Sequence, residues 1–269
     1  MRIGGQIGVW HIEKTEDAIR AMGEAGLDGI EVFIDHLVPY HDDPAPLSQA
    51  LADAGIAMSG AYFHTNRFVD PAAEDELVEH AAKASRCLAA VGGGFLVANG
   101  GAFWGEEKDA ERPTYTDSDF EQLAKILNRI ADTAAAEGIA TVMHPHLKST
   151  VETLADVDRL IASGLDQSKI GLCVHASHQA MIGADPYEIY EAHGGWVRYA
   201  HIGSAGAPGG GFLNEGTLDQ ERLMKPLLDA GYDGWIIIEC GKKDTTPAEY
   251  AANAMAYMKS TWPDVNWGS

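Results

Sequence analysis

Basic residues, long apolar runs and cysteines are all scarce in this chain. Lysine and arginine together number 19 against 40 aspartates and glutamates, so the formal net charge is −21. A general nucleic-acid binder needs basic surface to meet phosphates, and this charge argues against that class. No run approaches the roughly 18 apolar residues of a membrane-spanning helix. The opening MRIGGQ also lacks the basic and apolar regions of a secretory signal.

The three cysteines, Cys87, Cys173 and Cys240, are widely spaced along the chain. Their spacing gives no indication of disulfides, and a small buried thiol is the ordinary interpretation of a cysteine beside a strand end. We therefore expect a cytoplasmic protein with neither nucleic acid nor a membrane as its partner. The sequence leaves a homo-oligomer open.

Strand and helix patterns alternate eight times along the chain. Alternation with short returns predicts parallel strands joined by right-handed crossovers, and eight units are the number that closes a (β/α)8 barrel. We therefore expect an α/β protein in which residues 1–269 form a single TIM-barrel domain. The expected strands are approximately Ile3–Trp10, Gly29–Phe33, Ala57–Phe63, Gly94–Ala98, Ile139–Met143, Ile170–Val174, Val197–Ala200 and Gly234–Ile238. The expected helices lie near Thr15–Ala25, Leu47–Ala54, Ala72–Ala90, Asp117–Glu137, Val151–Ser163, Pro186–His193, Asp219–Ala230 and Pro247–Met258.

Glycines at the ends of the expected helices support this division. Seven of these helices end at a glycine suited to a left-handed cap, with a strand starting within a few residues. A doubly wound open sheet is the alternative, but no glycine-rich phosphate fingerprint lies between a strand and the helix that it opens. The capping glycines are Gly26, Gly55, Gly92, Gly138, Gly164, Gly194 and Gly231.

Four of the expected strands run directly into side chains that can bind a metal ion. Because the carboxyl ends of all barrel strands open on the same face, these side chains are expected to meet in one site. A shared site explains the pattern better than four independent coincidences. The residues that follow the four strands are His144-Pro145-His146, His175, His201 and Glu239.

Further polar and aromatic side chains are expected on the same face. His11 and His64 follow the first and third strands, while Phe63 and Trp104 contribute to an aromatic wall. A histidine-rich centre beside aromatic rings suits a small polyhydroxy compound as substrate. Arg198 is a candidate for binding substrate oxygens, with a solvated surface position as the alternative.

Five segments carry a resemblance to a known family. GLCVHASHQAMIGADP (Gly171–Pro186) and VRYAHIGSA (Val197–Ala205) are similar to the sixth and seventh strands of the xylose isomerase-like TIM-barrel family of sugar isomerases and epimerases. AGYDGWIIIE (Ala230–Glu239), preceded by LNEGTLD (Leu213–Asp219), is similar to that family's approach to strand eight and its terminal glutamate. HPHLKSTVET (His144–Thr153) resembles strand five of inosose dehydratase-like members.

This resemblance implies a single divalent metal held by Glu, Asp, His and Glu at the ends of strands five to eight. Position by position, those places are His144, His175, His201 and Glu239. The last two match the family, whereas histidines replace the usual glutamate and aspartate at the first two.

The strand-five loop offers alternatives for the first of these ligands. His146 follows the same strand, and Glu152 could supply a carboxylate from the loop. His178 matches a family histidine that usually lies close to the metal or the substrate, and we expect it to bind substrate.

The exchange of carboxylates for imidazoles changes the metal that is expected. Three neutral imidazoles and one carboxylate leave a bound dication with a net charge near +1, whereas three carboxylates and one histidine leave about −1. Imidazole favours transition metals over magnesium, so we expect one divalent Mn, Fe, Co, Ni or Zn ion. A more positive centre is also a stronger Lewis acid toward a substrate carbonyl.

The resemblance implies a metal-dependent isomerase or epimerase that acts on a small sugar, ketose or related polyhydroxy carbonyl compound. Glu239, His144, His146 and Glu152 are the candidates for moving a proton next to the carbonyl. A dehydratase of the inosose type, which is a lyase, is the alternative that the strand-five motif supports. A catalytically inactive barrel that serves as a binding protein is a third, because two family carboxylates are missing. DNA cleavage, as in endonuclease IV, disagrees with the net charge.

Overall fold

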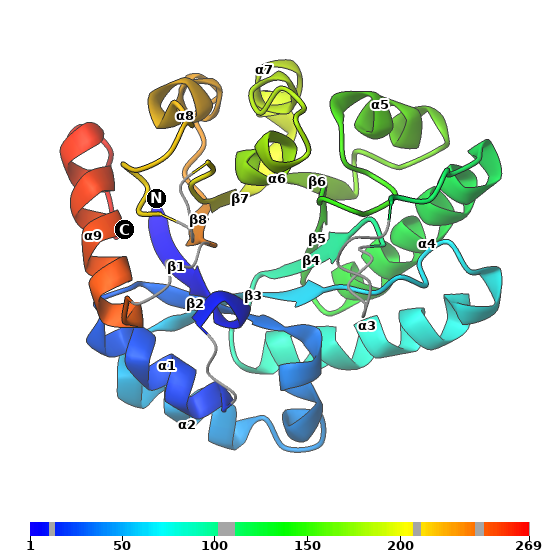
Figure 1. Cartoon of the computed structure of the whole chain (residues 1–269). Coiled ribbons are helices and arrows are strands. Elements are labelled where there is room, and N and C mark those ends of the chain that lie inside the picture. Colours follow the sequence, from blue (N-terminus) through cyan, green and yellow to red (C-terminus); the bar gives the residue numbers. More distant parts are fainter. Residues whose placement is uncertain (11–13, 102–110, 207–210, 240–244, 269) are drawn as a thin grey trace.

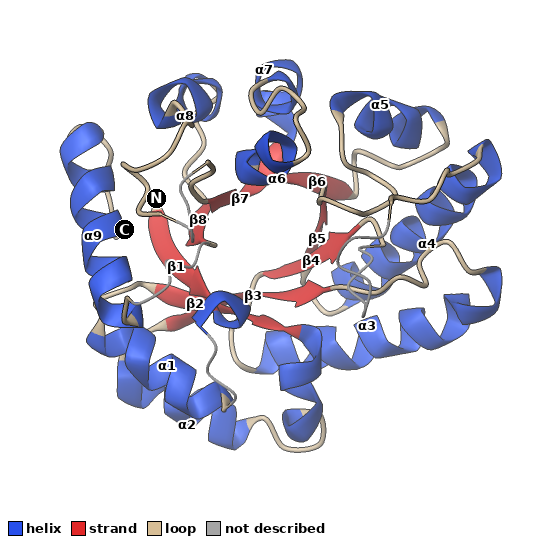
Figure 2. Cartoon of the chain, viewed as in Figure 1, coloured by secondary structure: helices blue, strands red, loops and turns tan. Residues whose placement is uncertain are grey.

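The computed structural model describes residues 1–10, 14–101, 111–206, 211–239 and 245–268. In this part of the chain, eight parallel strands close into a barrel in chain order, and helices surround it (Figures 1 and 2). The predicted (β/α)8 TIM barrel is therefore confirmed. No helix among the described residues is long and apolar enough to cross a membrane.

The strands are short and pair in parallel, with β1 next to β8 closing the ring. Their bounds are β1 (Arg2–Gln6), β2 (Gly29–Phe33), β3 (Ala57–Phe63), β4 (Phe95–Asn99), β5 (Ala140–His144), β6 (Ile170–Val174), β7 (Val197–Ile202) and β8 (Trp235–Ile238). The α-helices are α1 (Thr15–Glu24), α2 (Ala45–Ala54), α3 (Glu74–Ala90), α4 (Asp117–Ala136), α5 (Leu154–Ala162), α6 (Ala176–Met181), α7 (Glu188–His193), α8 (Gln220–Asp229) and α9 (Pro247–Thr261). Short 3₁₀ helices are η1 (Ile7–Trp10), η2 (Ile34–Tyr40), η3 (Pro71–Ala73) and η4 (Gly194–Trp196).

Some predicted boundaries were wrong. The first strand was expected to reach Trp10, but β1 ends at Gln6 and the chain then forms η1. The six-residue helix α6 was not predicted. Six of the seven predicted capping glycines have a positive φ, but Gly194 has φ −52° and belongs to η4. A Cβ on Gly194 would lie 3.0 Å from the Cβ of Pro226, so close packing against α8 explains this glycine.

Side-chain caps fix several helix starts. The helices α4, α5 and α9 each begin with a capping box, in which a threonine and an acidic residue three positions later satisfy each other's backbone N–H groups. In α5 the pair is Thr153 and Asp156, which explains why this helix starts at Leu154 and not at the predicted Val151.

Alternate residues of each strand face the interior of the barrel. The interior is filled by Tyr62, Val97, Val142, Cys173, Tyr199, Trp235 and Ile237, while a larger apolar cluster lies between the sheet and the helices. Because side chains alternate along a strand, the residue two positions beyond an interior one also points inward. Cys87 and Cys173 are buried free thiols, and Cys240 lies outside the described residues.

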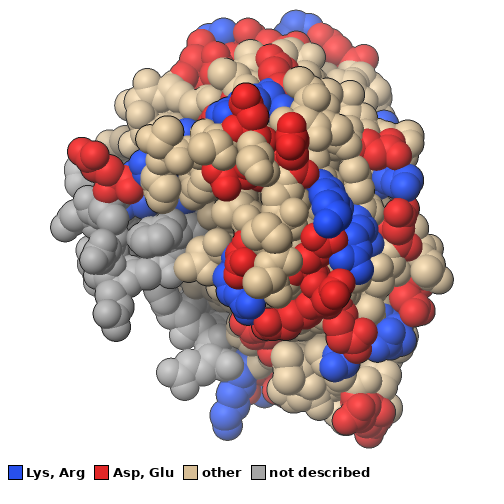
Figure 3. All heavy atoms as spheres, turned by 90° about the vertical axis from the view of Figure 1, so that its right-hand side faces the viewer, with Lys and Arg blue, Asp and Glu red and all other residues tan. Residues whose placement is uncertain are grey.

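Outside the barrel, one buried carboxylate connects α3 to α4. Glu74 is 6% exposed and accepts hydrogen bonds from Lys125 at 2.8 Å and from Arg129 at 2.5 Å. The hydrogen bond from Lys125 is the main cause that lowers the pKa of Glu74 from 4.5 to about 2. Acidic and basic side chains also lie among one another on the face shown in Figure 3.

We expect Glu74→Gln to lower the free energy of unfolding at pH 7 by about 1–2 kcal/mol, because the pKa shift sets an upper bound that water around the exposed cations reduces. The folded-state pKa lies below the ordinary value, so this contribution is present above about pH 4.5 and disappears as the pH falls toward 2. Urea unfolding at several pH values measures it. Glu79→Gln, whose carboxylate pairs with exposed Lys83 at 3.4 Å, is the control and should change little. A deficit for Glu74→Gln that is equal at pH 7 and pH 2.5 would contradict the assignment.

Candidate metal and substrate site

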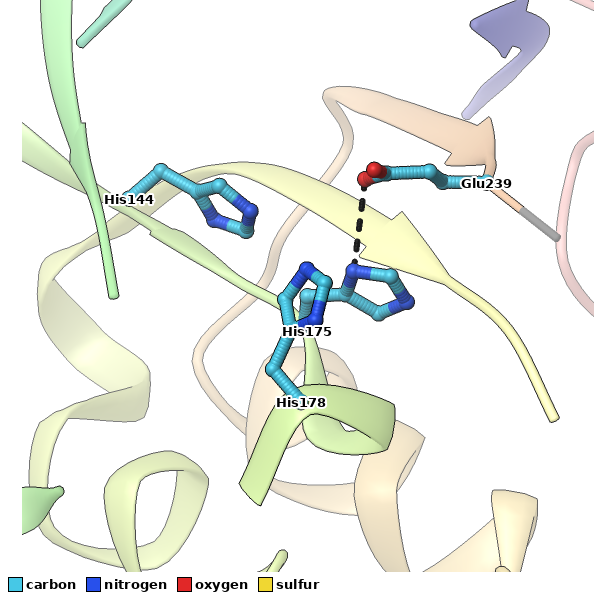
Figure 4. Close-up of side chains that lie close together, drawn as sticks. All are labelled: His144, His175, His178 and Glu239. Carbon is cyan, nitrogen blue, oxygen red and sulfur yellow. Dashed lines mark ion pairs between the residues drawn. The ribbon is translucent and has the colours of Figure 1, made fainter. Parts of the chain in front are cut away.

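Four potential ligands extend the inward face of their strands at the carboxyl end of the barrel. His144 is the last residue of β5, His201 lies in β7, and His175 and Glu239 directly follow β6 and β8. The three histidines are buried, and the side chain of Glu239 is 14% exposed. Figure 4 shows His144, His175 and Glu239 turned toward one another, with His178 reaching the same place from α6.

The ligand atoms of these residues converge. Oε2 of Glu239 lies 3.2 Å from Nδ1 of His175, and Nδ1 of His201 is also within ion-pair distance of it. None of these three atoms has a hydrogen-bond partner among the described residues. One ligand atom from each of His144, His175, His178 and Glu239 also lies within 4.8 Å of the others. Together these residues form a histidine-rich candidate metal site.

The outer hydrogen bonds of two histidines leave an imidazole nitrogen for this centre. Nδ1 of His144 lies 3.2 Å from the carbonyl oxygen of Cys173, which can only accept, so Nε2 keeps the lone pair. Nε2 of His201 lies 3.0 Å from a carboxylate oxygen of Glu31, which can only accept, so Nε2 carries a proton and Nδ1, which faces Glu239, is the nitrogen that could bind a metal after losing its own proton. Buried nitrogen and oxygen atoms that make no hydrogen bonds and face one another in this way fit the ligands of a divalent metal ion.

Burial keeps most of the imidazoles neutral. It lowers the pKa of His144 and His178 well below the usual value and that of His146 to about 4. Burial also raises the pKa of Glu239, but His201 and His175 outweigh it and hold that pKa well below its usual range.

His201 differs from the other histidines of the cluster. Burial lowers its pKa, but Cys173, Glu31 and Glu239 outweigh burial and raise the pKa well above its usual value. We attribute this rise to the two carboxylates, because burial raises the pKa of the Cys173 thiol and keeps it uncharged. His201 is therefore the imidazole most strongly held by negative charge.

Most of the other predicted site residues that the structure describes lie beside this cluster. The ring centroids of His146 and His178 are 3.9 Å apart, and neither nitrogen of His178 has a hydrogen-bond partner among the described residues. His64 is half-buried and stacks on Tyr62, whose ring in turn lies 5.7 Å from that of His144. His11 and Trp104 lie outside the described residues.

Of the two positions expected for Arg198, substrate binding or a solvated surface, the structure shows the surface one. It is the second residue of β7, at the amino end of the strand, where it is exposed and donates to the carbonyl oxygens of Gly195 and Val197. The register between β6 and β7 shifts at this point, so that Arg198 has no partner position on β6. The opposite end of the barrel holds the histidine cluster, and Arg198 does not reach it.

Phe63 was also wrongly expected in the aromatic wall. It packs outside the barrel against Phe68 and His80, with ring centroids 5.1 and 5.4 Å away. Tyr62, one residue earlier, faces the interior in its place. The alternation of a strand makes such a one-residue error exchange the two faces.

Glu152 makes its contacts away from the ligand atoms. Its carboxylate accepts a hydrogen bond from the backbone N–H of Lys148 and lies 3.4 Å from the guanidinium of Arg112. Arg112 in turn donates to the carbonyl oxygens of Ser149 and Thr150, at 2.7 and 2.5 Å. These contacts hold the loop after β5, including Lys148 at φ 57°. Glu152 is not part of either cluster of potential ligands found among the described residues.

Glu31 and Cys173 were missed as parts of the site. Glu31 stands in the middle of β2 and is 0% exposed, and Cys173 forms a second group of potential ligands with His144 and His201. The available signal was a glutamate inside the apolar segment GIEVF, because a buried carboxylate needs a partner.

Gly203 leaves room for the imidazole of His175. A Cβ at this position would lie 2.8 Å from Nε2 of His175 and 2.9 Å from the backbone oxygen of Glu239, which is closer than real Cβ contacts. We expect Gly203→Ala to displace His175 and to weaken metal binding by about 10- to 100-fold, as for other errors of ligand placement. Competition with a chromophoric chelator measures the affinity. Gly195→Ala is the control, because its Cβ would meet nothing within 4 Å. Equal affinity in both variants would show that the site tolerates the extra carbon.

The closed barrel and the converging imidazoles and carboxylate define a (β/α)8 protein with a candidate metal centre at the carboxyl ends of its strands. The chain belongs to the xylose isomerase-like TIM-barrel family, whose model matches residues 19–261. It is 28% identical to an inosose dehydratase from Lacticaseibacillus casei over 91% of this chain and 89% of that protein. An inosose dehydratase from Geobacillus thermodenitrificans is 26% identical over 96% of this chain and 91% of its own length.

Solved structures of sugar epimerases share the fold. An L-ribulose 3-epimerase superposes with a TM-score of 0.78 at 20% identity, over 98% of this chain and 95% of that one. A 3-keto-D-glucoside 4-epimerase from E. coli gives a TM-score of 0.75 at 19% identity, over 97% and 99% of the two chains. The predicted family is confirmed. The predicted class, a sugar isomerase or epimerase with an inosose-type dehydratase as the alternative, fits these relatives and neighbours.

Proposed function

We propose that this chain is a metal-dependent lyase that removes water from a small polyhydroxy ketone, in the manner of an inosose dehydratase. The observation that carries the proposal is the convergence of buried ligand atoms without hydrogen bonds: Oε2 of Glu239 faces Nδ1 of both His175 and His201, and His144 lies in the same cluster as His175 and Glu239. Whole-chain similarity to inosose dehydratases supports the substrate class.

One divalent Mn, Fe, Co, Ni or Zn ion fits this set of donors, because imidazole nitrogen prefers these metals to magnesium. His175 and Glu239 would hold it together with His201, whose Nδ1 faces the same oxygen of Glu239. His144 would be the fourth ligand, and His178, which clusters with His144, His175 and Glu239, is a close alternative. A metal in this place supplies Lewis-acid polarisation of the substrate's oxygens.

Proton transfer falls to the protein's own side chains. Glu239 is the candidate general base that takes the proton from the carbon next to the carbonyl, and the hydroxyl on the following carbon leaves as water once it gains a proton. His146 and His178 are neutral imidazoles at the same place, suited to exchange that proton. His64, which stacks on Tyr62, is a candidate contact for substrate hydroxyls.

Isomerisation or epimerisation of a keto sugar is the second candidate function. The sugar epimerases among the structural neighbours favour it, and both reactions begin with the same proton removal. Two-base epimerases of this family place glutamates at the ends of strands five and eight, whereas strand five ends here in His144. A ligating His144 has no lone pair left for a second base, which favours elimination over inversion.

The test is to incubate the purified protein, loaded in turn with each candidate metal, with inosose and with a panel of keto sugars in deuterated water. Elimination produces a conjugated carbonyl compound that absorbs in the near ultraviolet, whereas epimerisation gives deuterium incorporation without new absorbance. Absence of turnover on every compound, in protein that binds metal or substrate, would favour the inactive binding barrel. Absence of metal binding altogether would overturn the proposal.

A further inference from the structure

A second carboxylate lies beneath the candidate metal site, on the far side of His201. Glu31 comes from β2, and its Oε2 lies 3.0 Å from Nε2 of His201. Both side chains are fully buried, so the contact is shielded from water and from salt. Its partners are 170 residues apart in the chain, and only closure of the barrel brings them together.

Strand alternation places Glu31 on the inner face of β2, two residues before Phe33, which packs against the interior cluster. The pairing of β2 with β3 shifts between Ile30, which pairs with Met58, and Glu31, which pairs with Gly60. The skipped residue, Ser59, donates its hydroxyl to the carbonyl oxygen of Ile30 at 2.8 Å. Glu31 therefore reaches His201 from the inner face of β2, beside an irregularity in the pairing of β2 with β3.

We propose that Glu31 is a positioning residue that holds His201 for the metal. The inference rests on the proposed metal-dependent function and deepens it. A carboxylate oxygen can only accept, so the contact fixes a proton on Nε2 of His201 and turns Nδ1, the nitrogen left for the metal, toward Glu239. Without Glu31 the imidazole could rotate or exchange its tautomer.

Glu31 also changes the charge of the centre. His144 and His175 stand where the family has carboxylates, so a dication with Glu239 as its single anionic ligand would carry a net charge near +1. Glu31 adds one buried negative charge beside the ligand shell and brings the sum near zero. Glu31 thereby supplies part of the negative charge that the metal ligands themselves lack.

The experiment measures zinc affinity by chelator competition in the wild-type protein and in Glu31→Gln. Glutamine keeps an oxygen acceptor but removes the charge, and we expect affinity to fall by about 10- to 100-fold, the usual loss when a partner of a metal-binding histidine is changed. Glu74→Gln is the matched control, since it removes the charge of another buried carboxylate outside the barrel and should leave zinc affinity unchanged.

A second measurement needs no variant. In zinc-loaded wild-type protein with ¹⁵N-labelled histidine, the His201 resonances should report a protonated Nε2 and a metal-bound Nδ1. The reverse assignment, or equal zinc affinity in wild type and Glu31→Gln, overturns the role of Glu31 while the metal site itself stands. Failure of the wild-type protein to bind zinc or any other candidate metal overturns the proposed function together with this role.

Discussion

Glu239→Gln should lose about 100-fold or more in turnover on the substrate that the wild-type protein accepts, as is typical when a general base is removed. Glutamine keeps an oxygen near the same place, so the metal can stay bound while the basic carboxylate is absent. In the wild-type protein the imidazoles of His201 and His175 hold the pKa of Glu239 well below its usual range. The carboxylate is thus ionised throughout the physiological range, which is the form that a general base requires.

Two readouts separate loss of the base from loss of the metal. Turnover is measured at saturating metal, with the metal content of the variant determined on the same samples. Deuterium exchange at the carbon next to the carbonyl should decrease with turnover, because both require the same proton removal. Near-normal turnover in Glu239→Gln with bound metal would assign the proton to another group, for which His146 and His178 are the nearest candidates.

The fold was predictable because its signals are local and repeated. Apolar strands, amphipathic helices and capping glycines recur in each unit, and alternation of side chains then determines which strand-end residues meet. Helix α6 was missed because its six residues, ASHQAM, are too few to show a helical period. Gly194 was misread because a glycine required for close packing against Pro226 looks the same in the sequence as a capping glycine.

The site was predictable only where it follows from strand ends. His144, His175, His201 and Glu239 continue an inward face, so their meeting required no knowledge of side-chain geometry. Glu31 lies in the middle of a strand, and its contact with His201 joins β2 to β7, which are not neighbours in the barrel, so no local pattern in the sequence indicates it. Arg198 lies at the wrong end of the barrel for substrate because it is the second residue of β7, at the amino end of the strand.

His201→Ala should lose most of its bound metal, because the variant lacks one of the two imidazoles that face Oε2 of Glu239. It should also be less stable, since the change leaves the carboxylate of Glu31 buried without its partner. Removing one member of a buried pair costs about 3–5 kcal/mol. The barrel is expected to persist, because the pair contributes nothing to the strand ladder.

The double variant His201→Ala/Glu31→Gln separates these two effects. It removes the unpaired carboxylate of Glu31 as well as the ligand His201. Its free energy of unfolding should therefore be higher than that of His201→Ala, while it should still fail to hold metal. His193→Ala is the control. His193 ends α7 and pairs with Asp158 of α5, so this variant should keep wild-type metal content. Metal analysis and urea unfolding are carried out on the wild type, His201→Ala, the double variant and His193→Ala. A full equivalent of metal in His201→Ala would refute its role as a ligand, and a double variant no more stable than the single one would refute the pairing with Glu31.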